Sequence, residues 1–162
     1  MLKKFDAGTS LAEYDYDSQC QQSCPEGWQE FDRMCYLWVT DQERNWNEAE
    51  NFCKSKGGHL ASVTSLDVHN FMLEWAGLNK TKVWIGATDQ EREGTWIWSD
   101  CSSYNFEGWV HNATGKRKEN CAELYNTNEH EKGWNDLECK EQLNFVCATR
   151  VCSGNTTLRK GH

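Results

Sequence analysis

Nine cysteines constrain the fold of this chain of 162 residues more than any other feature. They are Cys20, Cys24, Cys35, Cys53, Cys101, Cys121, Cys139, Cys147 and Cys152. Cytosolic thiols at this density are mostly metal ligands. The sequence has no Cys-x-x-Cys and no His-x-x-x-His pattern, and Cys20 and Cys24 have no similarly spaced second pair. Disulfide bonds are therefore favoured over zinc, and we expect an oxidising compartment.

Length and charge limit the class of protein. The chain suffices for one globular domain with its own core. Its formal net charge of -8, from 17 basic and 25 acidic residues, opposes binding to nucleic acid. No window approaches 18 uninterrupted apolar residues, so we expect no membrane span in this chain. Three Asn-x-Thr triplets are candidate glycosylation sites and fit a secreted or extracellular protein: Asn79, Asn112 and Asn155.

The sequence divides into a central domain and two end segments. Residues 1–19 are expected to be a flexible extension that ends in an acidic run with two tyrosines. Sulfation could turn this run into a docking tail, but a solvated linker is favoured. We place the domain at residues 20–152 and a tail at 153–162. Met1–Lys4 begins like a secretory signal, but Phe5–Thr9 interrupts the apolar core that a signal requires.

The pattern along the domain is α+β. Helical spacing predicts a first helix over Asn45–Lys56, closed at Gly57-Gly58. Ser65 predicts the start of a second helix, which ends near Gly77. Runs rich in β-branched and aromatic residues predict strands at 31–39, 60–63, 83–87, 95–98, 122–125 and 144–147.

Between the predicted strands lies a long irregular connection, residues 100–120. A connection of about twenty residues is uncommon in a compact domain and usually carries function.

The order of landmarks resembles the C-type lectin-like domain family from Cys24 to Cys147. The landmarks are Cys24-Pro25-Glu26-Gly27-Trp28, Cys35-Tyr36, Trp46 to Cys53, Gly58-His59-Leu60-Ala61-Ser62, Trp84-Ile85-Gly86-Ala87, Gly94 to Asp100, Glu119 to Leu124, Trp134-Asn135-Asp136 with Cys139, and Phe145-Val146-Cys147. The resemblance implies an α+β fold with two helices packed on small antiparallel sheets, closed by disulfides and bearing a long irregular ligand-binding loop.

The resemblance also implies how the cysteines pair. The implied bonds are Cys24–Cys35, Cys53–Cys147, Cys121–Cys139 and, as in longer relatives, Cys20–Cys152. Cys101 is then left over beside the long loop. We favour a bridge from Cys101 to another chain, which would give a disulfide-linked dimer, over a buried free thiol.

The family's sugar-binding members use calcium, and part of their ligand set is present. Glu119, Asn135 and Asp136 match positions that hold the ion, and Asp89 and Glu93 match an auxiliary calcium site of some relatives. The alternative is that Asn135 and Asp136 cap a turn and that residues 89–93 form a solvated hairpin.

Other ligands are missing. The family's Glu-Pro-Asn or Gln-Pro-Asp triplet is replaced by His111-Asn112-Ala113 or Ala113-Thr114-Gly115, depending on the register, and Pro25 is the only proline. The basic run Lys116–Lys118 beside Glu119 would repel a divalent cation. It could instead attract anionic groups of a ligand.

We expect a secreted or extracellular carbohydrate-recognition module with weakened or altered calcium binding. Its candidate ligand-binding residues are Trp109, His111, Asn112, Lys116, Glu119, Asn135 and Asp136. The alternative is a calcium-independent module that binds protein, ice or mineral through the loop residues Tyr104, Phe106 and Trp109. We expect no enzyme, because the histidines form no recognisable nucleophile–base grouping.

Overall fold

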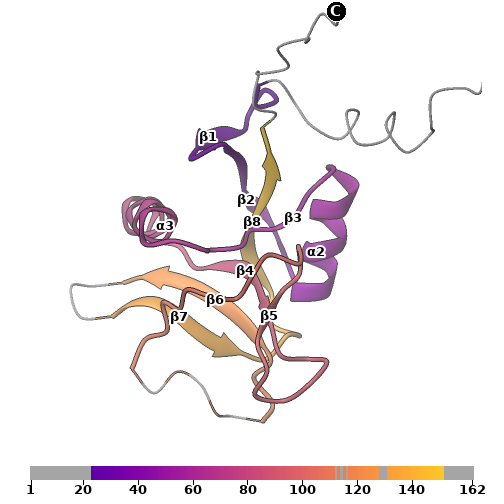
Figure 1. Cartoon of the computed structure of the whole chain (residues 1–162), viewed down its shortest axis with the longest axis vertical. Helices are drawn as coiled ribbons and strands as arrows, with labels where there is room; N and C mark the ends of the chain where they lie inside the picture. Colours follow the sequence, from indigo (N-terminus) through magenta and orange to yellow (C-terminus); the bar gives the residue numbers. More distant parts are fainter. Residues whose placement is uncertain (1–22, 112, 114, 116, 128–130, 152–162) are drawn as a thin grey trace, which may run out of the picture.

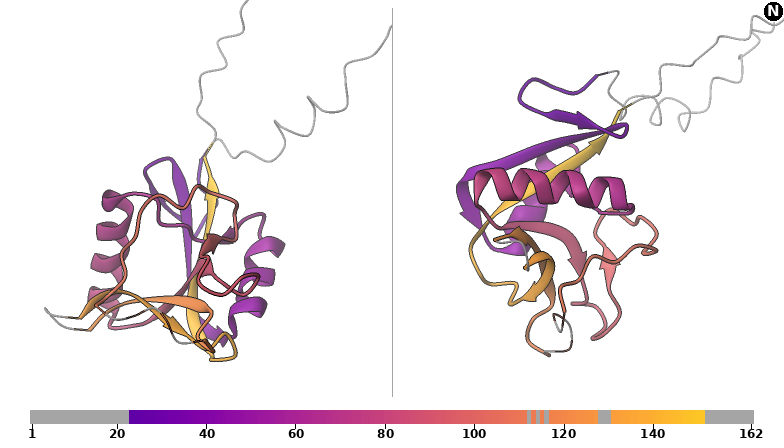
Figure 2. Two further views of the ribbon diagram at one scale, coloured as in Figure 1. Left: turned by 60° about the horizontal axis from the view of Figure 1, so that its bottom comes forward. Right: turned by 90° about the vertical axis from the view of Figure 1, so that its left-hand side faces the viewer.

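An eight-stranded sheet forms the centre of the computed structural model, with one helix on each side of its central strands (Figures 1 and 2). The structure describes residues 23–111, 113, 115, 117–127 and 131–151. The expected extension 1–19 and tail 153–162 lie outside the described residues.

The strands are joined in the order β1-β2-β8-β4-β6-β7, with β3 on β8 and β5 on β4. All strand pairs are antiparallel except β4 with β8, which is parallel and joins the expected small antiparallel sheets into one. The strands are β1 Gln29–Phe31, β2 Met34–Arg44, β3 His59–Leu60, β4 Val83–Thr88, β5 Ile97–Trp98, β6 Cys121–Asn126, β7 Lys132–Leu137 and β8 Leu143–Arg150.

Both predicted helices are confirmed, and local capping explains where they begin. Helix α2, Trp46–Ser55, starts with a capping box in which the Asn45 side chain accepts from the Glu48 amide at 2.9 Å. Helix α3, Leu66–Asn79, starts where the Ser65 hydroxyl accepts from the Val68 amide. It continues past the expected end at Gly77 and stops at Lys80, which is left-handed with φ 49.

Three predicted strands have wrong bounds. Of the run 95–98 only Ile97–Trp98 is a strand, paired with Ala87 and Thr88 of β4. The run 31–39 is interrupted by a tight turn at Asp32 and Arg33, whose φ values of 47 and 63 separate β1 from β2. The run 60–63 contributes only His59–Leu60 to the sheet, although Ala61 and Val63 are fully buried. Burial without strand pairing explains their apolar character.

Strand β7 was not expected. Gly133-Trp134-Asn135-Asp136 reads as a separator between strands, yet it pairs with β6 over six residues. Trp134 is fully buried, so tertiary packing of its side chain outweighs the low strand propensity of Gly, Asn and Asp.

Three disulfide bonds join described residues, and the pairings Cys24–Cys35, Cys53–Cys147 and Cys121–Cys139 are confirmed. The bond Cys53–Cys147 joins α2 to β8 inside one of the two apolar clusters of the core. Cys20 and Cys152 lie outside the described residues, so their pairing remains a prediction.

The two ends of the described chain leave the domain side by side. The Val151 amide donates to the Arg33 carbonyl at 3.0 Å, which holds the end of β8 against the turn between β1 and β2. In Figure 1 the indigo start and the yellow end of the described chain lie at this end, whereas residues 117–120, which lead into β6, lie at the opposite end.

Candidate functional site

The long connection is built around the ring of Trp134 on β7. Four aromatic or imidazole rings surround it with centroid distances of 5.3 to 5.9 Å and edge-on geometry: His69, Trp98, Phe106 and Trp109. Such edge-to-face pairs stabilise beyond the area that they bury. The connection therefore has an aromatic core of its own.

Backbone hydrogen bonds fix the connection to β7. The Trp134 amide donates to the Gly108 carbonyl at 2.8 Å, and the Val110 amide donates to the Trp134 carbonyl at 2.9 Å. A β-carbon on Gly108 would lie 2.4 Å from Cε1 of His69, so only glycine lets the backbone approach this closely.

The predicted ligand-binding residue Trp109 contributes to this packing. It is half-buried, and its indole nitrogen donates to the Tyr104 hydroxyl at 3.0 Å. Tyr104 and Phe106 are likewise half-buried, so the loop aromatics offered as protein-binding anchors are partly used inside the domain.

A buried polar pair lies next to the connection on β6 and β7. Register places Glu123 opposite Asn135, and the Asn135 amide donates to Oε1 of Glu123 at 3.1 Å. Nζ of Lys82 lies 3.9 Å from the same oxygen. Glu123 is only 2% exposed. Burial raises the pKa of its carboxyl, and the negative charge of Glu119 adds to this, while Asn135 and Lys82 oppose it.

Sequence analysis missed Glu123 as a site residue. The available signal was an acidic side chain in the middle of the predicted strand 122–125. Glu119, which was predicted, precedes β6 and is close enough for its charge to act on Glu123.

Asp136 occupies a different position from Asn135. It lies opposite Ala122 in the register and is 1% exposed. Consecutive side chains on a strand leave opposite faces. The interpretation that Asn135 and Asp136 only cap a turn is wrong, because both belong to β7.

The structure brings Asp89 and Glu93 together and adds Asn120. The amide end of Asn120 lies 2.9 Å from Oδ1 of Asp89 and 2.9 Å from Oε2 of Glu93. With its nitrogen turned toward them, Asn120 donates to both carboxylates. The amide of Gly94 donates to the other oxygen of Asp89 at 2.9 Å. Asp89 is only 4% exposed, which rules out a wholly solvated hairpin.

This cluster could hold a cation only if the side-chain oxygen of Asn120, and not its nitrogen, faced the two carboxylates. An amide oxygen so close to two carboxylate oxygens requires a positive charge among them, and oxygen donors are what calcium prefers. Among the described residues, no group of three or more His, Cys, Asp and Glu side chains is arranged to hold a metal. The predicted ligands Glu119, Asn135, Asp136, Asp89 and Glu93 therefore remain candidates.

The remaining site predictions fall on exposed or undescribed residues. His111 is exposed, and Asn112, Lys116 and Asn155 lie outside the described residues. Asn79 is exposed at the end of α3, where its side-chain nitrogen donates to the Trp75 carbonyl at 2.8 Å.

Cys101 is the free cysteine of the described part of the chain, and it is exposed. The alternative of a buried thiol is therefore wrong. Its φ of 65 lies in the left-handed region, where glycine is favoured.

This architecture, two helices on a mixed sheet closed by disulfides and topped by a long packed connection, defines a domain of the lectin-like class. The family model "Lectin C-type domain" matches residues 42–149. The chain belongs to the C-type lectin domain family, whose members are generally binding modules.

Similar proteins include both sugar-specific and other members. The galactose-specific lectin nattectin of Thalassophryne nattereri is 36% identical over 135 residues, which cover 80% of this chain and 82% of nattectin. The C-type lectin domain of murine dendritic cell inhibitory receptor 2, solved with an N-glycan, is 30% identical with a TM-score of 0.73, covering 79% of this chain and 99% of that one.

A calcium-independent type II antifreeze protein resembles this chain in fold about as closely as the receptor domain does. Its TM-score is 0.72 at 27% identity, covering 80% of this chain and 96% of that one. A Ca2+-dependent type II antifreeze protein, in its Ca2+-free form, is also similar, with a TM-score of 0.70 at 30% identity, covering 78% of this chain and 99% of that one. The same scaffold is thus found with and without dependence on calcium. In the part of the chain that the structure describes, neither helix has the length and apolar character needed to cross a bilayer.

Proposed function

We propose that this domain recognises carbohydrate outside the cell, with a ligand-binding surface formed by the long connection and strands β6 and β7. The observation that carries the proposal is the buried pair of Glu123 and Asn135 beside Glu119. A buried carboxylate with a raised pKa costs stability, and such groups cluster at functional sites. Support also comes from the similarity to a galactose-specific lectin and to a glycan-bound receptor domain.

Calcium is proposed to bind weakly. A calcium ion takes six to eight oxygen ligands. At Glu119, Asn135 and Asp136, the amide nitrogen of Asn135 is already bonded to Glu123, which leaves its oxygen available. The expected triplet that would complete the set is absent from the sequence. The auxiliary position at Asp89, Glu93 and Asn120 offers a second group of oxygens, of which only those of Asp89 belong to a buried residue.

The test is a calorimetric titration of calcium, followed by glycan-array binding in calcium and in chelator. We expect weak calcium uptake and glycan binding that falls in chelator. Asn135→Ala should lose binding, whereas His130→Ala, outside the proposed set, should retain it. No calcium uptake together with no glycan binding would reject the proposal.

A calcium-independent protein-binding module is the second candidate, and one contact favours it. Nζ of Lys82 lies 3.9 Å from the buried Glu123 carboxylate and supplies a positive charge there without a metal. This candidate predicts pulldown of a protein partner that free sugars do not compete away. Its melting temperature should be the same with and without chelator.

Localisation, glycosylation and covalent assembly are proposed together with this function. Disulfides at this density favour secretion. We expect glycosidase-sensitive mass at Asn79, Asn112 or Asn155 in material from a secretory host. Exposed Cys101 is proposed to bridge to a second chain. A dimer band on non-reducing gels that disappears in Cys101→Ser would support the bridge, and a monomer carrying a free thiol would reject it.

A further inference from the structure

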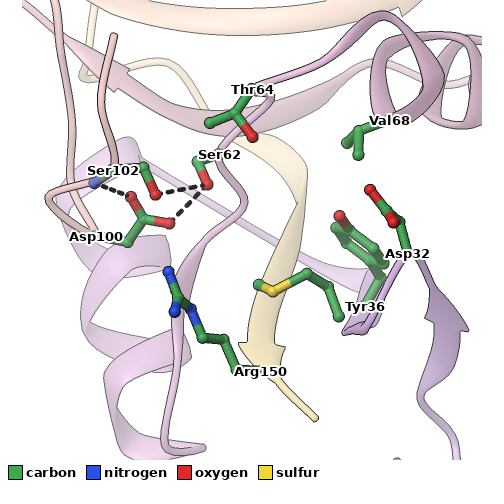
Figure 3. Close-up of a pocket in the computed structure, with 9 residues that line it drawn as sticks. Asp32, Tyr36, Ser62, Thr64, Val68, Asp100, Ser102 and Arg150 are labelled. Atoms are coloured by element: carbon green, nitrogen blue, oxygen red, sulfur yellow. Dashed lines mark hydrogen bonds between the residues drawn. The ribbon is translucent and has the colours of Figure 1, made fainter. Parts of the chain in front are cut away.

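A polar cavity of about 130 Å³ lies beside the C-terminal end of the described chain, where the long connection begins (Figure 3). It is enclosed by the turn between β1 and β2, the segment before α3, the turn at residues 100–102 and the end of β8. None of its residues belongs to the calcium or ligand-binding set described above. Its polar lining is formed by Asp32, Tyr36, Ser62, Thr64, Asp100, Ser102 and Arg150.

Tyr36 is the buried member of this lining. Its side chain is only 1% exposed, and no described residue forms a hydrogen bond with its hydroxyl, which faces the cavity. Burial raises the pKa of the phenol, and the charges of Asp32 and Asp100 raise it further. A phenol both donates and accepts. Because the hydroxyl faces the cavity, a ligand there could hydrogen-bond with it in either sense.

Asp100 is held rigidly on the other wall. Its Oδ2 accepts from the Ser62 hydroxyl at 2.6 Å, and its Oδ1 accepts from the Ser102 amide at 2.9 Å. The guanidinium of Arg150 points toward Asp100 across the cavity (Figure 3). An acceptor and a donor group thus lie near each other, and Asp100 is in place before any ligand arrives.

The lining decides between classes of ligand. Asp32 and Asp100 against Arg150 give a formal charge of -1, which opposes an anion. A bare cation would leave the donors of Tyr36 and Arg150 without acceptors. A neutral hydroxyl group both donates and accepts, so it can accept from Tyr36 or Arg150 and donate to a carboxylate. Met34 and Val68 provide an apolar wall for carbon atoms.

Size narrows the ligand further. Its volume of about 130 Å³ is well below the roughly 300–1,000 Å³ of pockets that enclose drug-sized ligands. That space accepts one edge of a sugar ring or a short polyol. We propose that the cavity binds two neighbouring hydroxyls of a neutral sugar or polyol, in a contact that needs no metal and does not involve Glu119, Asn135 or Asp136.

Amide NMR in chelator tests this. Glycerol and methyl α-mannopyranoside are titrated into the whole chain with excess EDTA. We expect saturable shifts at Ser62, Asp100 and Ser102, with a dissociation constant on the order of millimolar for so small a contact. Tyr36→Phe keeps the ring in the core and should weaken binding about fivefold or more. Tyr125→Phe removes a hydroxyl elsewhere and should leave binding unchanged.

Two results would overturn the proposal. One is the absence of saturable shifts, or equal binding by Tyr36→Phe, which would mean that only water fills the cavity. The other is binding of N-acetyl-lysine methylamide in place of both polyols, which would make the cavity a site for a cationic side chain. Because calcium is chelated throughout, either result leaves the proposed loop function untouched. Unchanged amide spectra outside the cavity confirm that Tyr36→Phe is folded.

Discussion

Glu123 and Asn135 face each other across β6 and β7 and share a hydrogen bond of 3.1 Å inside the domain. Removing the Asn135 amide leaves the buried Glu123 carboxylate without this hydrogen bond. The loss of stability is larger than for a typical surface substitution. We expect Asn135→Ala to lower the free energy of unfolding by about 1–3 kcal/mol in urea titrations.

The matched control for this pair is a double-mutant cycle. In a Glu123→Gln background the charge is gone, so Asn135→Ala should cost clearly less. Equal costs in the two backgrounds would show that the charge of Glu123 adds nothing to the hydrogen bond, which the glutamine oxygen can still accept.

His69 should make the domain less stable in acid. Burial lowers its pKa below 6.5, and no described residue bonds to its Nδ1. Its neutral form therefore stabilises the fold fully above pH 6.5, and this contribution is lost as pH falls from there toward the folded-state pKa. Its ring packs against Phe106 and Trp134, so protonation should also loosen the long connection.

Urea titrations and tryptophan fluorescence between pH 7.5 and about 5 check this, since that range spans the unfolded pKa of His. His69→Leu should reduce the loss of unfolding free energy between high and low pH. His111→Gln, a change at an exposed residue, should leave that loss as it is in the parent. Glu123 has the opposite effect on the pH dependence of stability, because its raised pKa favours the folded state at low pH. Each variant is therefore compared with the parent at the same pH. Parallel curves for the parent and His69→Leu would contradict the prediction.

Asn120→Asp should convert the Asp89 and Glu93 cluster into a calcium-dependent element. Without metal, the new carboxylate, at 2.9 Å from those of Asp89 and Glu93, repels both of them. The melting temperature of the variant in EDTA should therefore be several degrees below that of the parent. Calcium should restore it. The parent should respond less, because its amide can bridge the two carboxylates by hydrogen bonds. An unchanged melting temperature in EDTA would contradict this.

Trp134 should be the residue on which the long connection most depends. Trp134→Ala removes the ring that His69, Trp98, Phe106 and Trp109 contact, and we expect a cost of about 3–5 kcal/mol. Hydrogen exchange should increase at residues 99–111.

The control is Trp96→Ala, because Trp96 is half-buried and its ring contact is with Trp109. Its cost should be smaller, with faster exchange confined to the neighbourhood of Trp109. Equal exchange in both variants would mean that Trp134 does not organise the connection.

Local signals explain what the sequence predicted correctly. Asn45 and Ser65 are caps that act within three residues, so both helix starts could be placed from the sequence. The disulfide pairing came from the resemblance and not from spacing, because cysteine positions alone leave many pairings open.

Long-range pairing explains what was missed. Strand β7 exists because Trp134 is buried and β6 lies alongside, and neither fact is visible in Gly133-Trp134-Asn135-Asp136. Asn120 and Glu123 were overlooked for the same reason, since their partners Asp89 and Asn135 lie far away in the sequence.

The closeness of Val151 to the turn at Arg33 has a consequence for avidity. Anything attached at either end of the described chain would extend from the side opposite residues 117–120 (Figure 1). If several copies were joined through a segment attached at these ends, here called the stem, the faces opposite the stem would all point in the same direction. Weak individual contacts could add up on a repetitive target, with an effective concentration set by the stem and not by the domain.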